Sequence, residues 1–389
     1  MTPAAGPAQI RNLDALRAIA VLLVMLFHWR LLAVGWIGVS IFFVISGFLI
    51  SRILLGYKAR FGLGEYLGVF YSRRALRIFP IYYLYVGIWT VVAAVAFVPS
   101  DFAFAPLITY TFNFTRWAPD YAGSRAFTHL WSLSVEEQFY LVYPLVVFAL
   151  GRWSLAAALV GVVALSPLLR LAAGAMAFAA HPDPVYAGRV VSVASFLHLD
   201  GFAVGGLIAL AEPHLARLSR RAVVAGALAL GGALTAAFVV NALAFAAAPP
   251  PAAADPYFVG ASALGLPVNP FHGLQHAWVY SAIYLAAGLV IVVGLRALQR
   301  PLAPLAPLNA IGRVSYGMYL YHFALISVFE RALPGVPKLS VAGLAVFGLY
   351  VATVVGLAML SYRYIETPFN ALKPDALRLA AWRRREATP

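Results

Sequence analysis

The chain consists of long apolar segments separated by shorter polar connections. A helix that crosses a bilayer needs about 20 consecutive, mainly apolar residues, and ten segments have this character. They cover residues 13–34, 37–56, 79–99, 132–150, 154–172, 193–211, 222–247, 276–296, 308–331 and 340–363. The pattern predicts an all-α integral membrane protein with about ten transmembrane helices. It forms one transmembrane domain over residues 1–370, followed by a basic cytoplasmic tail at 371–389.

Two of the connections have a character of their own. Residues 57–78 mix basic and aromatic side chains, which predicts an amphipathic helix at the membrane surface. Residues 248–275 are rich in Pro, Gly and Ala, which predicts an irregular connector or lid.

The composition supports the membrane assignment and narrows the chemistry. The chain is 63% hydrophobic and only 11% charged, whereas soluble domains are about 25% charged. It has no cysteine, which excludes disulfides, thiolate metal sites and cysteine nucleophiles.

The net charge of +14 is explained by topology. With both termini cytoplasmic, ten spans place 21 of the 28 Lys and Arg residues on the inner side, in agreement with the positive-inside rule. The basic residues then contact anionic lipid headgroups, so nucleic-acid binding is not indicated. We therefore expect a multi-pass protein of the plasma (inner) membrane, in contact with the lipid bilayer.

Titratable residues inside the spans are the main functional candidates, because such groups are costly in a membrane unless they are paired or functional. Arg17 and His28 are eleven positions apart, on one helix face and about 16 Å from each other. His28, Glu136, His322 and Asp200 are predicted in the outer halves of four spans. They form either interhelical hydrogen bonds or a catalytic or transport site. None has the local spacing of a metal site, so no metal is expected.

Two further patterns lie at the helix ends. The stretch "YSRRALRIFP" places Arg74 and Arg77 on one helix face. Arginine binds phosphate oxygens bidentately, so these residues and Arg17 are predicted to form a cationic inner mouth or to anchor lipid phosphates. Glu137 follows Ser134 at the spacing of a helix-capping box.

The ordered motifs of the chain resemble those of the acyltransferase 3 family. These are multi-span enzymes that move an acyl group from acyl-coenzyme A to hydroxyls of carbohydrates and related acceptors. The matching motifs are Arg17 and His28 as Arg-x10-His, "GVSIFFVISGFLI", Arg74 and Arg77 as Arg-x-x-Arg, "LWSLSVEEQFYLVYP", "GRVSYGMYLYHF" and "YRYIETPF". Ser40 stands where many members have Asp, so the role of an acid there does not carry over.

The resemblance implies a donor site and a catalytic pair. The donor is acyl-CoA, expected to be acetyl-CoA, with its phosphates at Arg17, Arg74 and Arg77. His28 is the expected base that takes the acceptor's hydroxyl proton, because imidazole titrates near neutral pH. Glu136 is expected to orient the other ring nitrogen of His28 or to polarise the hydroxyl. Direct transfer and an acyl-histidine intermediate both remain open.

Four residues are candidates for supporting roles. His322 and Tyr319 are expected to bind the acceptor or stabilise the carbonyl oxygen. Asp200 is a further candidate for substrate binding or support, and Trp131 is a candidate for stacking on a sugar ring or for anchoring at the membrane interface.

The implied reaction is O-acylation, expected to be O-acetylation. The acceptor is a surface or exported carbohydrate, such as a polysaccharide, O-antigen, exopolysaccharide or glycolipid. One alternative is acylation of a small-molecule glycoside such as a macrolide sugar. Another, of a different class, is a proton-coupled transporter of an anionic or acylated solute, although the chain lacks the internal repeat of many transporters. The sequence leaves open the acceptor, the acyl chain length and the oligomeric state, including a homo-oligomer.

Overall fold

The computed structural model describes residues 13–95, 104–121, 123–124, 126–215, 217–247, 257, 266, 273–296 and 303–374. Every regular element within these ranges is a helix, and each of the ten predicted apolar segments contains one. The all-helical expectation is therefore confirmed. Most of the expected 248–275 connector, and the tail beyond residue 374, lie outside the described residues.

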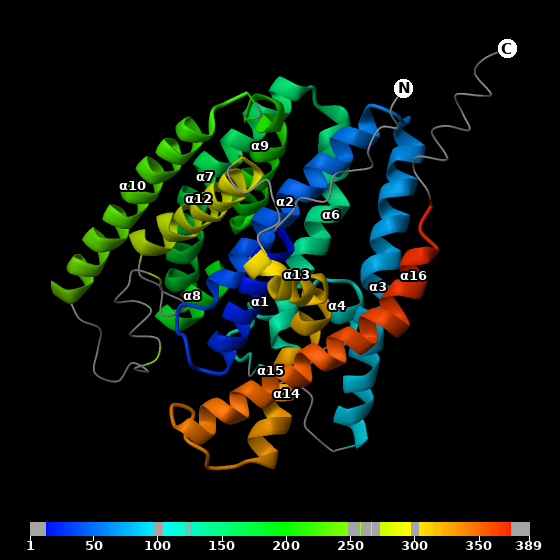
Figure 1. The fold of residues 1–389 in the computed structure, drawn as a ribbon. Coiled ribbons are helices and arrows are strands. Elements are labelled where there is room, and N and C mark those ends of the chain that lie inside the picture. The colour runs from blue at the N-terminus through cyan, green and yellow to red at the C-terminus, as the bar shows by residue number, and fades with distance from the viewer. Residues whose placement is uncertain are drawn as a thin grey trace.

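The helices follow one another along the whole chain (Figure 1). They are α1 (Leu13–His28), α2 (Ile37–Lys58), α3 (Leu63–Val95), α4 (Phe104–Ile108), α5 (Phe112–Thr115), α6 (Trp131–Ala149), α7 (Arg152–Ala180), α8 (Pro184–Val193), α9 (Leu199–Leu215), α10 (Arg220–Ala247), α12 (Leu274–Arg296), α13 (Ala306–Arg313), α14 (Ser315–Ala332), α15 (Val341–Ser361) and α16 (Thr367–Ala371). Short 3-10 turns precede α6, α9 and α13, and a π-helical turn, Tyr362–Glu366, joins α15 to α16.

Among the residues that the structure describes, six helices are long and apolar enough to cross a membrane. Their candidate spans are Ile37–Lys58, Leu63–Val92, Arg152–Ala180, Arg220–Leu243, Leu274–Leu295 and Val341–Ala371. The helices in the other four predicted spans are shorter or more polar; α1 and α9, for example, have 16 and 17 residues. The helical membrane class is thus shown, whereas the number of ten spans stays a prediction.

One predicted span is longer than expected, and one is divided. The surface helix expected at 57–78 and the span expected from residue 79 form one continuous helix, α3, which passes through Pro80. The segment predicted as a single span over 308–331 is two helices, α13 and α14, separated at Val314. The sequence pattern alone does not distinguish these cases, because a segment of this length and composition is compatible with one helix or with two.

The break before α14 allows α13 to pack against the start of α1. The Asn309 Oδ1 atom accepts a hydrogen bond from the Ala15 N–H at 2.9 Å, which satisfies a donor of the first helical turn. Gly312 lies so close that a Cβ atom there would be 1.7 Å from the Asp14 carbonyl oxygen. This contact holds the end of α1 that carries Arg17.

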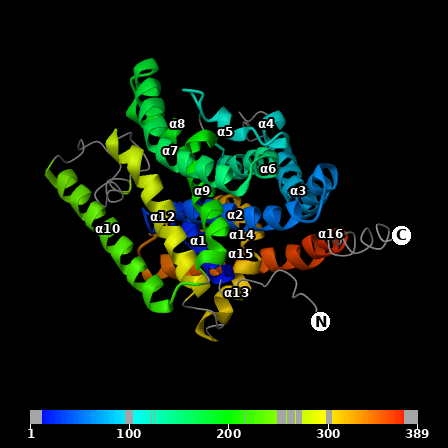
Figure 2. The same ribbon diagram turned by 90° about the horizontal axis from the view of Figure 1, so that it is seen from above.

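Helix α2 is the centre of the bundle and contacts α1, α3, α6, α9 and α12 (Figures 1 and 2). Its contact with α9 is backbone to backbone. A Cβ atom on Gly47 would lie 2.1 Å from the Phe202 carbonyl oxygen, and one on Gly205 would lie 2.2 Å from that of Val44. Glycines of this kind allow membrane helices to approach closely.

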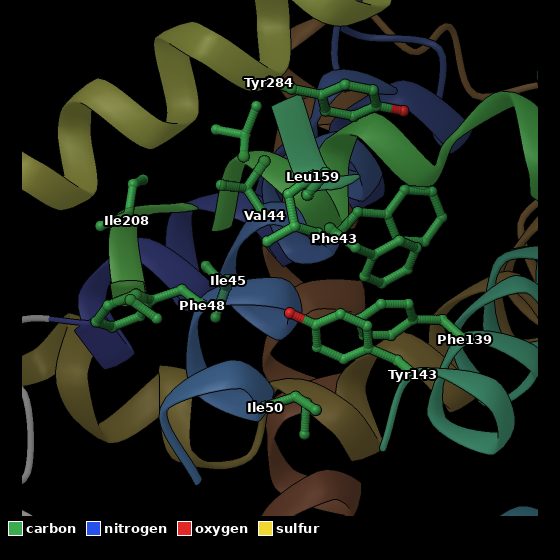
Figure 3. Packing of buried hydrophobic residues seen from close by; sticks show 14 of the residues in the cluster. Phe43, Val44, Ile45, Phe48, Ile50, Phe139, Tyr143, Leu159, Ile208 and Tyr284 are labelled. Atoms are coloured by element: carbon green, nitrogen blue, oxygen red, sulfur yellow. The ribbon is translucent and has the colours of Figure 1, made fainter. Parts of the chain in front are cut away.

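Aromatic side chains fill the space around this glycine contact. Figure 3 shows Phe43 and Phe48 of α2 with Phe139 and Tyr143 of α6 and Tyr284 of α12. The Phe139 ring is also stacked on the ring of Phe202, with centroids 4.1 Å apart. This packing fixes α2 and α6, the two helices that carry Ser46 and Glu136, relative to each other.

The connection between α3 and α6 folds back into the bundle. The Tyr110 ring is stacked on Tyr82 of α3 at 4.4 Å between centroids, and the Tyr82 hydroxyl donates to the Leu107 carbonyl at 2.9 Å. From α6, Gln138 donates to the Tyr110 carbonyl at 2.7 Å. Residues 104–121 are therefore packed between two helices that contribute to the site.

Candidate active site

One pocket brings together the three arginines predicted to bind the donor. It has a volume of about 100 Å³ and is lined by parts of α1, α2, α3, α6 and α14. Its polar lining residues are Arg17, Arg74, Arg77, Ser46, Ser132, Glu136, Tyr140, Ser315, Tyr316 and Tyr319. Arg17, Arg74, Arg77, Glu136 and Tyr319, named from the sequence on four different helices, thus share one cavity.

The arginines are held by short-range contacts. The Arg17 Nη1 atom forms an ion pair with Asp14 Oδ1 at 2.8 Å, one helical turn away. The Arg74 guanidinium lies over the Tyr140 ring, 5.2 Å from its centroid. Aromatic faces attract guanidinium groups, so the Tyr140 ring orients Arg74. The carboxylate of Asp14 orients Arg17.

The chain after α16 brings Lys373 near the arginines of α3. Arg73 Nη1 donates to the Pro374 carbonyl at 2.7 Å, which ties this segment to α3. Burial, together with the neighbouring Arg77, Arg73 and Arg74, lowers the pKa of Lys373 to about 8. Burial is the largest cause of this shift, and the arginine charges add to it, so Lys373 lies within electrostatic range of Arg73, Arg74 and Arg77.

Glu136 is fixed by two hydroxyl groups. The Ser46 hydroxyl of α2 and the Tyr140 hydroxyl of α6 both donate to the Glu136 Oε1 atom. Sequence reasoning did not identify Ser46, because a serine in an apolar span gives no signal until its partner is known.

The expected helix cap at Ser134 and Glu137 is wrong. Helix α6 already begins at Trp131, so Ser134 lies inside the helix, and its hydroxyl donates to the Leu130 carbonyl at 3.3 Å. A side chain within the helix that hydrogen-bonds to the preceding turn cannot serve as the N-cap.

His28 pairs with His322 from α14. The His28 Nδ1 and His322 Nε2 atoms are 2.9 Å apart, and His322 Nδ1 is 2.6 Å from the Tyr319 carbonyl oxygen. Because a carbonyl only accepts, His322 Nδ1 carries its proton and, in a neutral pair, His322 Nε2 accepts from His28 Nδ1. The unprotonated nitrogen of His28 is then Nε2. His322, and not Glu136, is the partner of His28 Nδ1.

A third histidine, which was not predicted, lies beside this pair. The His129 ring centroid is 5.0 Å from that of His322, and its Nε2 atom donates to the Leu320 carbonyl at 3.1 Å. The Tyr319 hydroxyl donates to the His129 carbonyl at 3.0 Å and lies 2.5 Å from the Ser132 hydroxyl. Tyr319 and Ser132 thus connect the pocket to the histidines. His129 directly precedes the motif around Glu136 and lies before α6, outside the predicted span over 132–150, so the search for titratable residues within spans did not include it.

Asp200 and Trp131 are not among the residues that line the pocket. Asp200 forms a fully buried bidentate ion pair with Arg170 of α7, with oxygen to nitrogen distances of 3.0 and 2.9 Å, and accepts from the Ser281 hydroxyl. Trp131 contacts the rings of Phe43 and His198. Arg170 is a charged residue inside a predicted span, so the rule that identified Asp200 would also have found its partner.

Among the residues that the structure describes, no group of three or more His, Asp or Glu side chains is arranged to hold a metal ion. The pocket lining supplies guanidinium, carboxylate and hydroxyl groups. The imidazoles of His28 and His322 are not among the lining residues and adjoin the pocket through Tyr319, whose carbonyl oxygen contacts His322.

The fold and the pocket define a helical membrane protein with a cationic, hydrogen-bonding site inside its bundle. The model of the acyltransferase 3 family, an acyltransferase domain, matches residues 10–363. The chain therefore belongs to the acyltransferase 3 family.

Named relatives agree with this assignment. The chain is 26% identical over 387 residues to the peptidoglycan O-acetyltransferase OatA of Listeria monocytogenes, covering 93% of this chain and 56% of that protein. It is 26% identical over 400 residues to the O-acetyltransferase OatA of Staphylococcus aureus, with 94% and 58% covered. A putative O-acetyltransferase of Staphylococcus aureus strain COL is 28% identical, with 96% and 59% covered. The chain spans less than two thirds of the length of these relatives. No solved structure matches it.

Proposed function

We propose that the protein transfers an acetyl group from cytosolic acetyl-CoA to a hydroxyl of a surface or exported glycan. The observation that carries this proposal is the pocket in which Arg17, Arg74 and Arg77 meet Glu136. Glycan as the acceptor class is supported by the relatives, one of which is named for peptidoglycan O-acetylation.

The arginines suit the donor's phosphate groups. Coenzyme A carries several phosphate charges, and arginine binds phosphate oxygens bidentately. Arg17 is ion-paired with Asp14, whereas Arg74 is held over an aromatic ring, which leaves its donors suited to an anion. The phosphates then lie at the start of α1, and the pantetheine arm extends along that helix toward His28.

The acyl transfer uses His28 as the base. The acceptor oxygen attacks the thioester carbonyl carbon while its proton passes to His28 Nε2. The carbon–sulfur bond then breaks, and the coenzyme A sulfur leaves with the proton that His28 returns. His322 holds His28 in the required tautomer through Nδ1, as the third group of a catalytic triad does. Attack by His28 itself, with a transient acyl-histidine, uses the same geometry.

Glu136 and Tyr319 both line the pocket, and we assign them supporting roles. Glu136 is held rigidly by Ser46 and Tyr140, and we assign it to accept a hydrogen bond from the acceptor hydroxyl. Tyr319 holds both His322, through its carbonyl, and the His129 backbone, through its hydroxyl. We assign it to position the imidazole pair.

The proposed topology has ten spans in the inner membrane, with both termini cytoplasmic. It directs the Arg17 end of the pocket toward the inner side of the membrane and the Ser132 end toward the outer side. An acceptor from outside then reaches the histidines without competing with coenzyme A. A cytosolic macrolide sugar would have to share the inner entrance, so the exported glycan is favoured.

The direct test uses purified full-length protein in nanodiscs with acetyl-CoA labelled on the acetyl group, with and without glycan oligosaccharides. We expect the label to appear as an alkali-labile ester on the glycan. Retention of all label on coenzyme A with every glycan and with water would contradict the proposal.

The arginine pair gives a prediction about binding. Replacing Arg74 and Arg77 together by alanine removes two sets of charge-assisted hydrogen bonds, each worth about 1.5–3 kcal/mol. We expect the dissociation constant of coenzyme A, measured by titration calorimetry, to rise at least about a hundredfold. The matched control is Arg220→Ala with Arg221→Ala, an exposed pair at the start of α10. Equal affinity in the two double variants would assign Arg74 and Arg77 to lipid anchoring.

A further inference from the structure

An arginine that does not line the donor pocket lies in the connection between α5 and α6. Arg116 follows α5, in the segment that folds back between α3 and α6. This segment is firmly docked: Gln138 of α6 donates to Asn113 Oδ1 at 2.9 Å, and Asn113 donates to the Ser195 hydroxyl at 2.9 Å. The backbone that carries Arg116 is therefore held in place by two neighbouring elements.

A second arginine holds the chain that follows. Arg189 of α8 donates to the carbonyl oxygens of Ala118, Pro119 and Tyr121, at 2.9, 3.2 and 3.3 Å. The Tyr121 hydroxyl lies 3.1 Å from the Thr128 hydroxyl, directly before His129. These contacts place the segment that follows Arg116 against Thr128, the residue before His129.

The Arg116 guanidinium lacks an acceptor among the described residues. The Arg116 Cζ atom lies over the Tyr121 ring, 5.7 Å from the ring centroid. Its Nε atom is buried without a hydrogen-bond partner. Arg116 also acts electrostatically on both His28 and Tyr319. A guanidinium that is partly withdrawn from water without a partner is costly, and an anionic ligand removes that cost.

This cation has no use in the reaction as described so far. The donor phosphates are assigned to the arginines at the start of α1 and on α3, whereas Arg116 lies on the connection that the topology places outside. We infer that Arg116 binds a carboxylate of the acceptor, so the protein selects an acidic glycan, one with a carboxylate close to the acylated hydroxyl. This inference rests on the proposed function and specifies its acceptor.

The test compares two acceptors that differ only in charge. One is a uronic-acid oligosaccharide, and the other is the same oligosaccharide with its carboxylates reduced to alcohols. For Arg116→Gln we expect KM for the acidic acceptor to rise about tenfold to a hundredfold. We expect its kcat, and KM for acetyl-CoA, to stay near wild-type values. Arg116→Lys keeps the charge and should recover part of the loss.

The matched control is Arg331→Gln, an exposed arginine at the far end of α14. This variant should leave KM and kcat unchanged for both acceptors. Equal loss of kcat on the charged and reduced acceptors in Arg116→Gln would overturn the inference, because it would indicate a role in stabilising the transition state. Wild-type protein that prefers the reduced acceptor, or uses neither while still releasing acetyl from the donor, would also overturn it. Failure to consume acetyl-CoA at all would instead count against the proposed function.

Discussion

Replacing His28 by glutamine is expected to lower acetyl transfer by about 10²- to 10⁴-fold, the usual contribution of a general base. Glutamine is polar and of similar size, but it cannot accept the acceptor's proton. The affinity for coenzyme A should be unchanged, because Arg17, in the proposed phosphate site, is about 16 Å from His28 along α1. Labelled transfer and calorimetric binding, measured on the same nanodisc preparation, separate the two effects.

The matched control for His28 is His181→Gln. His181 is an exposed histidine at the end of α7, away from the pocket lining. We expect wild-type transfer in this variant. Wild-type transfer in His28→Gln would remove His28 from the reaction. If His28→Gln binds coenzyme A a hundredfold more weakly, His28 belongs to the donor site instead.

The largest expected effect on stability comes from Arg170. Replacing it by methionine leaves Asp200 as an unpaired charge in a fully buried position, and breaking a buried ion pair in this way costs about 3–5 kcal/mol. Arg170 also donates to the carbonyls of Leu197 and Ala277, so it joins α7 to the start of α9 and to α12. We expect a clear decrease in the unfolding midpoint of the detergent-solubilised protein.

Two comparisons make the Arg170 result specific. The double variant Arg170→Met with Asp200→Leu removes both charges and should recover most of the stability, because replacing a whole buried pair by apolar groups is often neutral. Lys338→Ala breaks an exposed ion pair with Glu330 and should cost at most about 1 kcal/mol. A double variant as unstable as Arg170→Met would show that the hydrogen bonds to the carbonyls, rather than the charge, stabilise the bundle.

The candidate site was only partly predictable from the sequence. Arg17, Arg74 and Arg77, which the sequence grouped as charged residues on defined helix faces, line one pocket, and their role as a donor site stays a prediction. The partner of His28 was not predictable. His322 lies almost 300 residues later in the chain, and its tautomer depends on the Tyr319 carbonyl. The sequence gives no signal for Ser46, His129 or Arg116, because each residue type is common at its position. Their roles depend on neighbours that only the structure shows.

The sequence by itself determined the helical membrane class, the family and the faces of individual helices. These follow from the length of apolar segments, the absence of cysteine and the spacing of motifs, all of which are local properties of the chain. Only the tertiary structure decided which polar groups pair across helices: His28 with His322, Glu136 with Ser46, and Asp200 with Arg170. The physical reason is that helix packing is set by close contacts such as that of Gly47 with Phe202. Small residues fix the approach and rotation of helices without leaving a polar pattern in the sequence.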